Sequence, residues 1–579
     1  MNPTKIAINA PNIVVANPQH NAVEIIKASK EAAAAGCQLI LFPALCVTGA
    51  TCGDLFRQER LLSAAEKAIQ QIAQELADSG ICIVFGAPKK INGNLYDCIL
   101  ALHRGEVIAC VERNVSLAMT RWFAANGKGH GSFSFPLEDG ACRVQVISRT
   151  SVSEEKNADI ILYPDSMPTI VGSYDGVAEW LQTLSQQTDA PIVYQNAGFG
   201  ESTTDNVFGG EGLVVWNGCT VFEAERFQIA SLLNVVQFPS MASSFEQNND
   251  EENARYDDFM PENQPRRNRY LREVINIQVA ALAKRFLHTQ AEKLVLGVSG
   301  GLDSTLAMIV CVETLQLLGR NPDDLLAVTM PGYGTSSRTY QNAQKLMSLF
   351  GADAREISIK AACEQHFDDI GHDRRPDVTF ENAQARERTQ ILLDLAGMHN
   401  GIVVGTGDLT ELALGFATYN GDHMASYGVN AGVPKTIVRA AVRYAAECGM
   451  YKDEIAKVLI DIVETPISPE LLPPLETGDI AQKTEEIVGP YELNDFFLYM
   501  VLTNGCVPSE ILEAAEKRFG TYGREEIRKQ LNAFYRRFFT QQFKRSCLPD
   551  GPQVFGVTLS PRGGFVMPCD ADGAMWQLV

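Results

Sequence analysis

The segment KLVLGVSGGLDST (293–305) carries residue types that suit the binding of a phosphate. It predicts an apolar strand, a small-residue loop at Ser299, Gly300 and Gly301, and a helix that opens at Leu302. Backbone N–H groups of such a loop point outward, the helix dipole adds positive potential, and glycine lets the backbone approach a phosphate closely. No GK[ST] sequence follows, so this is not a Walker loop. The segment predicts an anion site, and a ligand-free glycine turn is the alternative.

The segments that follow must bring this loop and its neighbours to one edge of a sheet. Apolar strands are expected at 325–331, 354–359 and 402–405, with helices at 336–350 and within 377–400 between them. This alternation predicts a parallel sheet covered on both faces, a doubly wound α/β fold. Ligands of such folds lie beyond the C-terminal ends of the strands. Because SGGLDS, MPGYGTSS and GTGDLTE all follow strands, we expect these three loops to line one crevice.

Several motifs in this half resemble those of a known enzyme family. SGGLDST looks like the pyrophosphate-binding loop of ATP pyrophosphatases, which split ATP to adenylate a substrate. With it, GTGDLTELALGFATYNGDH (405–423) and FENAQARERTQ (380–390) resemble the NAD(+) synthetases, which amidate deamido-NAD(+). Further matching motifs are YGVNAGVPKT (427–436), TPISPELLP (465–473), QKTEEIVGPYELNDFFLY (482–499) and FKRSCLPDGP (543–552).

The resemblance implies roles for residues at the matching positions. Asp303 and Glu411 would bind Mg²⁺ through hard oxygen donors, and Lys435 would join them in catalysis. ATP would contact Gly297, Ser299, Gly300, Gly301, Asp303, Ser304, Thr406, Lys435 and Ser468. Deamido-NAD(+) would contact Asn382, Arg386, Glu411, Phe416, Thr418, Tyr419 and Lys544. Ordinary readings stand beside these: Arg386 and Arg388 as salt-bridged helix residues, Lys544 as a surface base, and His366 and His372 as structural residues.

The N-terminal part resembles a second family. LILFPALCVTGATCGDLF (39–56) and VYQNAGFGESTTDNVFGGEGLVVWNG (193–218) are similar to the carbon–nitrogen hydrolase, or nitrilase, family, which implies an αββα sandwich. That family hydrolyses amides with a Glu–Lys–Cys triad of base, oxyanion stabiliser and nucleophile. The three positions fall on Ala44, on Arg113 with Asn114 as its less favoured alternative, and on Ser148. Ala44 carries no proton, Arg113 does not lose its charge, and no base adjoins the Ser148 hydroxyl. We expect a glutaminase-type domain that is inactive.

Composition and length limit the number of domains, the kinds of partner and the location that we expect. The 579 residues predict more than one domain: a nitrilase-like domain at 1–240, an acidic linker at 241–265 and a synthetase domain at 266–579. The net charge of −21 disfavours nucleic acid and membrane surfaces as partners. We expect neither a signal peptide nor a membrane span, since no apolar run reaches roughly 18 residues, and the 14 cysteines form no CxxC pair. A cytoplasmic protein with reduced thiols is expected. The resemblance suggests a homo-oligomer.

The sequence therefore predicts an ATP- and Mg²⁺-dependent NAD(+) synthetase that uses free ammonia, or ammonia from a separate supplying enzyme. Three alternatives remain open. One is a glutamine-dependent synthetase whose nucleophile is misassigned, with Cys46 and Cys142 as substitutes for Ser148. The second is a non-catalytic assembly or regulatory protein. The third is a related pyrophosphatase-loop enzyme such as a GMP synthetase.

Overall fold

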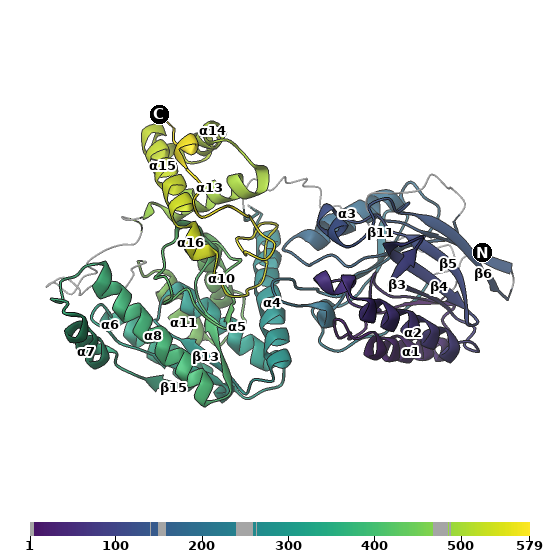
Figure 1. The fold of residues 1–579 in the computed structure, drawn as a ribbon, viewed down its shortest axis with the longest axis horizontal. Coiled ribbons are helices and arrows are strands. Elements are labelled where there is room, and N and C mark those ends of the chain that lie inside the picture. Colours follow the sequence, from purple (N-terminus) through teal and green to yellow (C-terminus); the bar gives the residue numbers. More distant parts are fainter. Residues whose placement is uncertain are drawn as a thin grey trace. The chain divides into compact units, whose positions relative to one another are not determined.

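The chain forms two compact units, Met1–Glu252 and Asn253–Val579, which are described separately (Figure 1). The computed structural model describes residues 5–138, 140–148, 158–238, 259–261, 263–466, 485 and 488–578. Most of the predicted linker, 241–265, lies outside these residues. The boundaries expected from the sequence therefore stay a prediction.

The first unit contains two six-stranded sheets. The first has the order β12-β1-β2-β3-β4-β5 and the second has the order β11-β10-β9-β8-β7-β6. The strands of the first sheet are β1 (Lys5–Ile8), β2 (Leu39–Leu41), β3 (Cys82–Ile91), β4 (Asn94–His103), β5 (Glu106–Glu112) and β12 (Asn234–Gln237). Those of the second are β6 (Gly131–Leu137), β7 (Gly140–Val146), β8 (Ile160–Pro164), β9 (Ile192–Gln195), β10 (Gly212–Trp216) and β11 (Cys219–Glu223).

Alternation along the strands builds the layers of this unit. In β3, Cys82 and Val84 join a buried cluster shared by both sheets, whereas Ile83 and Phe85 join a cluster with helices α1 (Pro18–Ala34) and α2 (Glu59–Glu75). A third cluster packs α3 (Ser173–Ser185) on the outer face of the second sheet. Successive side chains of a strand point to opposite faces, so each sheet is buried on both sides. The order helix, sheet, sheet, helix is the predicted αββα sandwich (Figure 1).

The second unit is built on one parallel sheet with the order β15-β14-β13-β16-β17. Its strands are β13 (Lys293–Gly297), β14 (Leu325–Thr329), β15 (Asp353–Glu356), β16 (Gly401–Gly405) and β17 (Tyr427–Gly428). The strand order reverses between β13 and β16, which pair directly with each other. A doubly wound sheet binds its ligands at such a point, beyond the C-terminal strand ends. The loops after β13 and β16 carry SGGLDS and GTGDLTE, so both begin beside this point.

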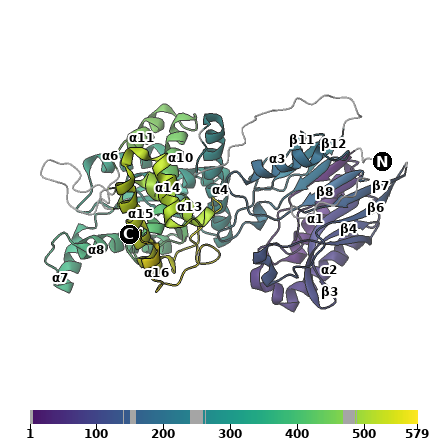
Figure 2. The ribbon, with the colours of Figure 1, turned by 90° about the horizontal axis from the view of Figure 1, so that it is seen from above.

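Helices cover the sheet and extend beyond it. The apolar side of α8 (Val378–Met398) packs on one face with Val295, Leu326 and Val403 of the strands. The helices of this unit are α4 (Gln264–Thr289), α5 (Leu302–Leu317), α6 (Ser337–Phe350), α7 (Lys360–Ile370), α8 (Val378–Met398), α9 (Leu409–Leu414), α10 (Lys435–Glu447), α11 (Asp453–Val463), α13 (Tyr491–Asn504), α14 (Pro508–Arg518), α15 (Arg524–Thr540) and α16 (Gln542–Arg545). Both views show α13, α14 and α15 side by side (Figures 1 and 2). Within the described part of the chain, no helix is both long and apolar enough to cross a membrane.

Short 3-10 helices complete the list in both units. They are η1 (Gly53–Arg57), η2 (Leu117–Arg121), η3 (Phe199–Glu201), η4 (Pro322–Asp324), η5 (Gly520–Tyr522) and η6 (Ala574–Trp576). The doubly wound sheet of the second unit and the sandwich of the first confirm the fold class that the sequence predicted.

Candidate active site

The loop after β13 has the backbone that the sequence predicts for a phosphate site. Gly300 has φ +86°, and a Cβ atom there would lie 2.1 Å from the backbone oxygen of Thr339, so only glycine fits. Ser299 Oγ lies 3.1 Å from Ser304 Oγ and accepts the N–H of Gly301 at 3.2 Å. α5 then begins at Leu302 without a side-chain cap. The uncapped helix start and the tight turn present backbone donors to an anion.

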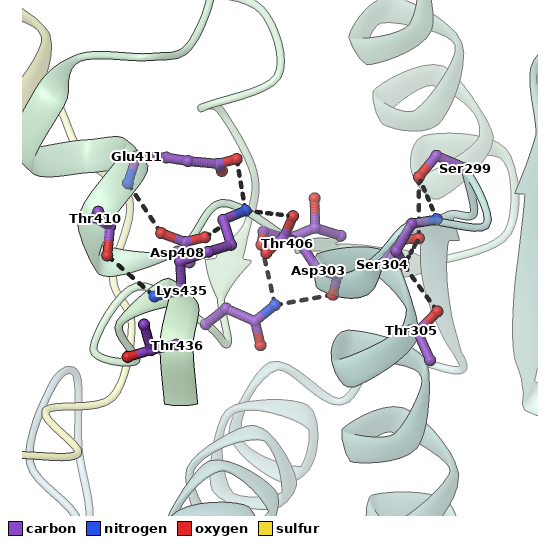
Figure 3. A network of polar contacts seen from close by, with 12 residues as sticks. Ser299, Asp303, Ser304, Thr305, Thr406, Asp408, Thr410, Glu411, Lys435 and Thr436 are labelled. Carbon is purple, nitrogen blue, oxygen red and sulfur yellow. Dashed lines mark hydrogen bonds and ion pairs between the residues drawn. The ribbon is translucent and has the colours of Figure 1, made fainter. Parts of the chain in front are cut away.

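Three carboxylates and one ammonium group meet beside this loop (Figure 3). Lys435 Nζ lies 2.7 Å from Asp303 Oδ2, 2.6 Å from Asp408 Oδ2 and 2.8 Å from Glu411 Oε1. Asp408 is fully buried and Lys435 is 1% exposed. Asp303 comes from α5, Glu411 from α9 and Lys435 from α10, so three separate helix starts supply the cluster.

The electrostatics of this cluster favour a bound cation. Burial is the main reason that the pKa of Glu411 rises to about 7; Lys435 opposes this rise and Asp303 adds to it. Burial also raises the pKa of Asp408 well above its usual range. Burial by itself lowers the pKa of Lys435. The three carboxylates outweigh burial and raise this pKa well above its ordinary value. When the three acids are ionised they outnumber the single ammonium group, and a bound cation would offset the excess negative charge.

The same carboxylates suit Mg²⁺. One oxygen each from Asp303, Asp408 and Glu411 lies within 4.8 Å of the others. Asp303 Oδ1 is buried and makes no hydrogen bond among the described residues. Hard, anionic oxygens are the ligands that Mg²⁺ prefers. The residues present therefore fit the predicted metal, with Asp303 and Glu411 as the expected ligands and Asp408 as a neighbour that the sequence reasoning did not single out.

Backbone contacts hold the loops of the cluster together. The side-chain nitrogen of Asn430 donates to the backbone oxygens of Asp303 and Thr406 at 2.9 and 3.0 Å. Asp408 caps α9 by accepting the N–H of Glu411 at 2.9 Å. The loops after β13 and β16 are thus fixed to each other, as their positions beside the switch point predict.

A second group contains most of the residues expected to contact deamido-NAD(+). Thr418 Oγ1 donates to Asn382 Oδ1 at 2.9 Å, and Arg386 donates to the backbone oxygen of Tyr419 at 3.3 Å. Lys544 Nζ donates to the backbone oxygens of Gly415 and Ala417, each at 2.7 Å. The backbone N–H of Phe416 donates to the backbone oxygen of Glu411 at 2.9 Å and joins this segment to α9. The structure brings α8, the 415–419 segment and α16 together next to the carboxylate cluster.

Other residues singled out from the sequence have different surroundings. Arg388 donates to the backbone oxygen of Met330 at 3.1 Å, and His372 lies 3.1 Å from Asp377, which caps α8. His366 lies on α7, outside both groups. Gly297 ends β13 directly before the loop. Ser468 lies outside the described residues.

In the first unit, the three positions expected to match the hydrolase triad follow β2, β5 and β7, and these strands belong to two different sheets. Ala44, Arg113 and Ser148 are buried. The guanidinium of Arg113 forms ion pairs of 2.8 Å with both Asp97 and Asp165. The N–H of Ala44 donates to the backbone oxygen of Asp165 at 3.2 Å. β7 and β8 pair with Val146 opposite Leu162, and this register carries Ser148 to the same sheet edge as Asp165.

Ser148 and the two candidate cysteines lack the features of an activated nucleophile. Ser148 Oγ is buried without a hydrogen bond among the described residues, so none of those residues is placed to accept its proton. Burial raises the pKa of Cys46 to about 12 and that of Cys142 to about 12. Both thiols belong to apolar clusters. A thiol in such surroundings stays protonated and inert at neutral pH.

Comparisons with known proteins match both units. A family model described as NAD synthase matches residues 274–530, and one described as carbon-nitrogen hydrolase matches residues 5–171. A glutamine-dependent NAD(+) synthetase of Mycobacterium bovis is 31% identical, over 99% of this chain and 97% of that protein.

Two solved structures share the fold. A glutamine-dependent NAD(+) synthetase from Cytophaga hutchinsonii has a TM-score of 0.80 at 20% identity, over 99% of this chain and 98% of that one. A structure of glutamine-dependent NAD+ synthetase from Acinetobacter baumannii in complex with ADP has a TM-score of 0.67 at 20% identity, over 96% of this chain and 97% of that one. This chain belongs to the NAD(+) synthetase family, as a ligase that forms a carbon–nitrogen bond and carries an N-terminal nitrilase-like domain.

Proposed function

We propose that the second unit adenylates the nicotinate carboxylate of deamido-NAD(+) with ATP and then converts the adenylate to the carboxamide with ammonia. The observation that carries this proposal is the meeting of Asp303, Glu411 and Lys435 beside the glycine loop. A carboxylate oxygen attacks the α-phosphorus of ATP, and the bond to the β-phosphate breaks to release pyrophosphate. Ammonia attacks the acyl carbon, AMP leaves with its electron pair, and a proton is lost.

The residues of the chain would overcome the charge repulsion between the two substrates. Backbone N–H groups at 299–302 would hold phosphate oxygens, and Asn382, Arg386 and Lys544 would position the dinucleotide. Asp303 and Glu411 would hold Mg²⁺, which when bound neutralises charge on the phosphates. Lys435 adds a fixed positive charge between those two acids. The enzyme's contribution is then orientation, charge neutralisation and exclusion of water from the acyl-adenylate.

The nitrogen source has two candidates, each with its own support. The relatives are named glutamine-dependent NAD(+) synthetases, so the comparisons favour glutamine, the alternative reading of the sequence, over free ammonia. The side chains at the three hydrolase positions favour ammonia. Ala44 has no acid–base group, Ser148 Oγ makes no hydrogen bond with any described residue, and Arg113 is paired with two carboxylates. We propose ammonia on the strength of those three positions.

The assay that separates the candidates is NAD(+) formation from deamido-NAD(+), ATP and Mg²⁺, run in parallel with ammonium and with glutamine freed of ammonia. Turnover with ammonium alone supports the proposal. Turnover with glutamine shows that a nucleophile other than the expected one works, and substitutions S148A, C46A and C142A then identify it. If neither ammonium nor glutamine supports turnover, the proposed NAD(+) synthetase activity is contradicted.

Two further predictions accompany this function. A homo-oligomer is expected, and light scattering of the full chain tests it. The cytoplasmic location also stays a prediction. Family membership as a ligase leaves the non-catalytic and GMP-synthetase alternatives without support.

A further inference from the structure

The motif GPYELNDFF (489–497) has no role in the function described so far, yet its helix reaches the carboxylate cluster. Asp495 of α13 is 3% exposed. Its Oδ2 accepts the N–H of Thr436 at 2.8 Å and the hydroxyl of Thr436 at 2.6 Å. Its Oδ1 accepts the hydroxyl of Thr410 in a short hydrogen bond. One buried carboxylate therefore contacts both α9 and α10.

These contacts replace a missing helix cap. α10 begins at Lys435, and its N-cap residue, Pro434, provides no side-chain acceptor. The first N–H groups of a helix have no partner inside the helix. Here Thr410 Oγ1 accepts the N–H of Lys435 at 3.0 Å, and Asp495 accepts the N–H of Thr436. A carboxylate at this end also interacts favourably with the helix dipole.

The chain of contacts runs between the two helix starts that carry the active-site charges. Thr410 lies directly before Glu411 in α9, and Lys435 is the first residue of α10. Tyr491 stands one turn before Asp495 on α13, and its ring centroid lies 5.4 Å from Lys435 Nζ. Residues four apart share one helix face, so this face of α13 meets the ammonium group of Lys435 through Tyr491 and the backbone of the next residue, Thr436, through Asp495.

We propose that Asp495 is a positioning residue for the adenylation step. It sets the start of α9 against the start of α10, so that Lys435 and Glu411 meet Asp303. Asp495 acts through Thr410 and Thr436 and touches neither substrate. The proposal rests on the roles assigned above to Lys435 and Glu411.

The test is ATP–pyrophosphate exchange by the full chain carrying D495N, with deamido-NAD(+) and Mg²⁺ present. Asparagine keeps the shape, but its amide nitrogen cannot accept a hydrogen bond, so one threonine contact is lost. We expect kcat to fall about 10- to 100-fold, because misplacement by about an ångström costs rates of that order. The KM for ATP should change by less than about threefold. The control is D461N, which alters a carboxylate that binds Arg338 and Asn342 in the same unit.

A double-mutant cycle with T410V separates positioning from a general loss of structure. Both substitutions break the same link to Lys435, so the double variant should be no more than about twofold slower than the slower single variant. Multiplicative losses, or a D495N rate that falls only in proportion to the fraction unfolded at the assay temperature, would overturn the proposal. Absence of exchange in the unaltered protein would instead contradict the proposed function.

Discussion

Glu411 is a proposed Mg²⁺ ligand whose pKa is raised to about 7, and this combination makes the proposed role measurable. Replacing Glu411 by Gln removes an anionic oxygen from the Mg²⁺ site, so the apparent Mg²⁺ affinity should fall at least about 10-fold, or about 1.4 kcal/mol. The measurement is the initial exchange rate against Mg²⁺ concentration. E313Q is the control, because Glu313 is a hydrogen-bonded acid on α5 that contacts Tyr451 rather than the cluster.

The pH dependence of the same titration tests the pKa. Because the pKa of Glu411 is raised to about 7, its protonated form becomes populated as pH falls from 8 to 6. A proton then competes with the metal, so more Mg²⁺ is needed at pH 6, and saturating Mg²⁺ should remove the difference. E411Q should show less of this pH dependence. An unchanged Mg²⁺ requirement between pH 6 and pH 8 would contradict the role.

Cys46 and Cys142 make a second prediction at the residue scale. Both pKa values are raised to about 12 by burial, so at pH 8 each thiol is protonated. Iodoacetamide should leave both unmodified in the folded protein while it labels the exposed Cys448 and Cys569. Peptide mass spectrometry after a timed reaction gives the answer. Rapid labelling of Cys46 or Cys142 would support the alternative in which that cysteine is the nucleophile of an active glutaminase.

At the scale of elements, Gly300 shows how one residue shapes the phosphate loop. A side chain at this position meets the Thr339 backbone oxygen at 2.1 Å and has to adopt φ +86°. G300A should therefore lower thermal stability and abolish exchange, whereas a Cβ at Gly301 meets only Ser299 Oγ, at 3.3 Å. Calorimetry of G300A beside G301A tests this. Equal melting temperatures for the two variants would show that the turn tolerates a side chain.

The elements also explain which parts of the site could be predicted from the sequence. Asp303 and Glu411 lie in the first turns of helices that follow apolar strands after short loops, so the strand pattern predicts that both lie at one sheet edge. The sequence does not predict a role for Asp408 in the cluster, because an Asp before a helix is an ordinary cap. Its ion pair with Lys435 forms only when the chain folds. Asp495 is 59 residues from Thr436, and no local pattern links positions so far apart. The helices after residue 450 were likewise not assigned from the sequence.

At the scale of the whole molecule, the two units have different relations to their families' chemistry. The second unit gathers the side chains that its family resemblance implies for adenylation. The first unit keeps the nitrilase-like sandwich, but Arg113, directly after β5, forms ion pairs with Asp97 and Asp165. We infer that this buried ion-pair network stabilises the first unit rather than serving amide hydrolysis, and this leads to the last prediction.

R113M should destabilise the first unit and leave the activity of the second unit unchanged. Removing the guanidinium leaves Asp97 and Asp165 buried without a counter-ion, which costs about 3–5 kcal/mol. Tryptophan fluorescence during urea unfolding reports mainly on this unit, since three of the four tryptophans, at 122, 180 and 216, belong to it. R143M, which breaks an ion pair of a largely exposed arginine, should shift the midpoint much less.

Adding D97N and D165N to R113M should restore part of the lost stability, because the unpaired charges disappear. Under native conditions ammonium-driven NAD(+) formation by R113M should match that of the unaltered chain, whereas selective loss of glutamine-driven turnover would show that Arg113 works in a glutaminase.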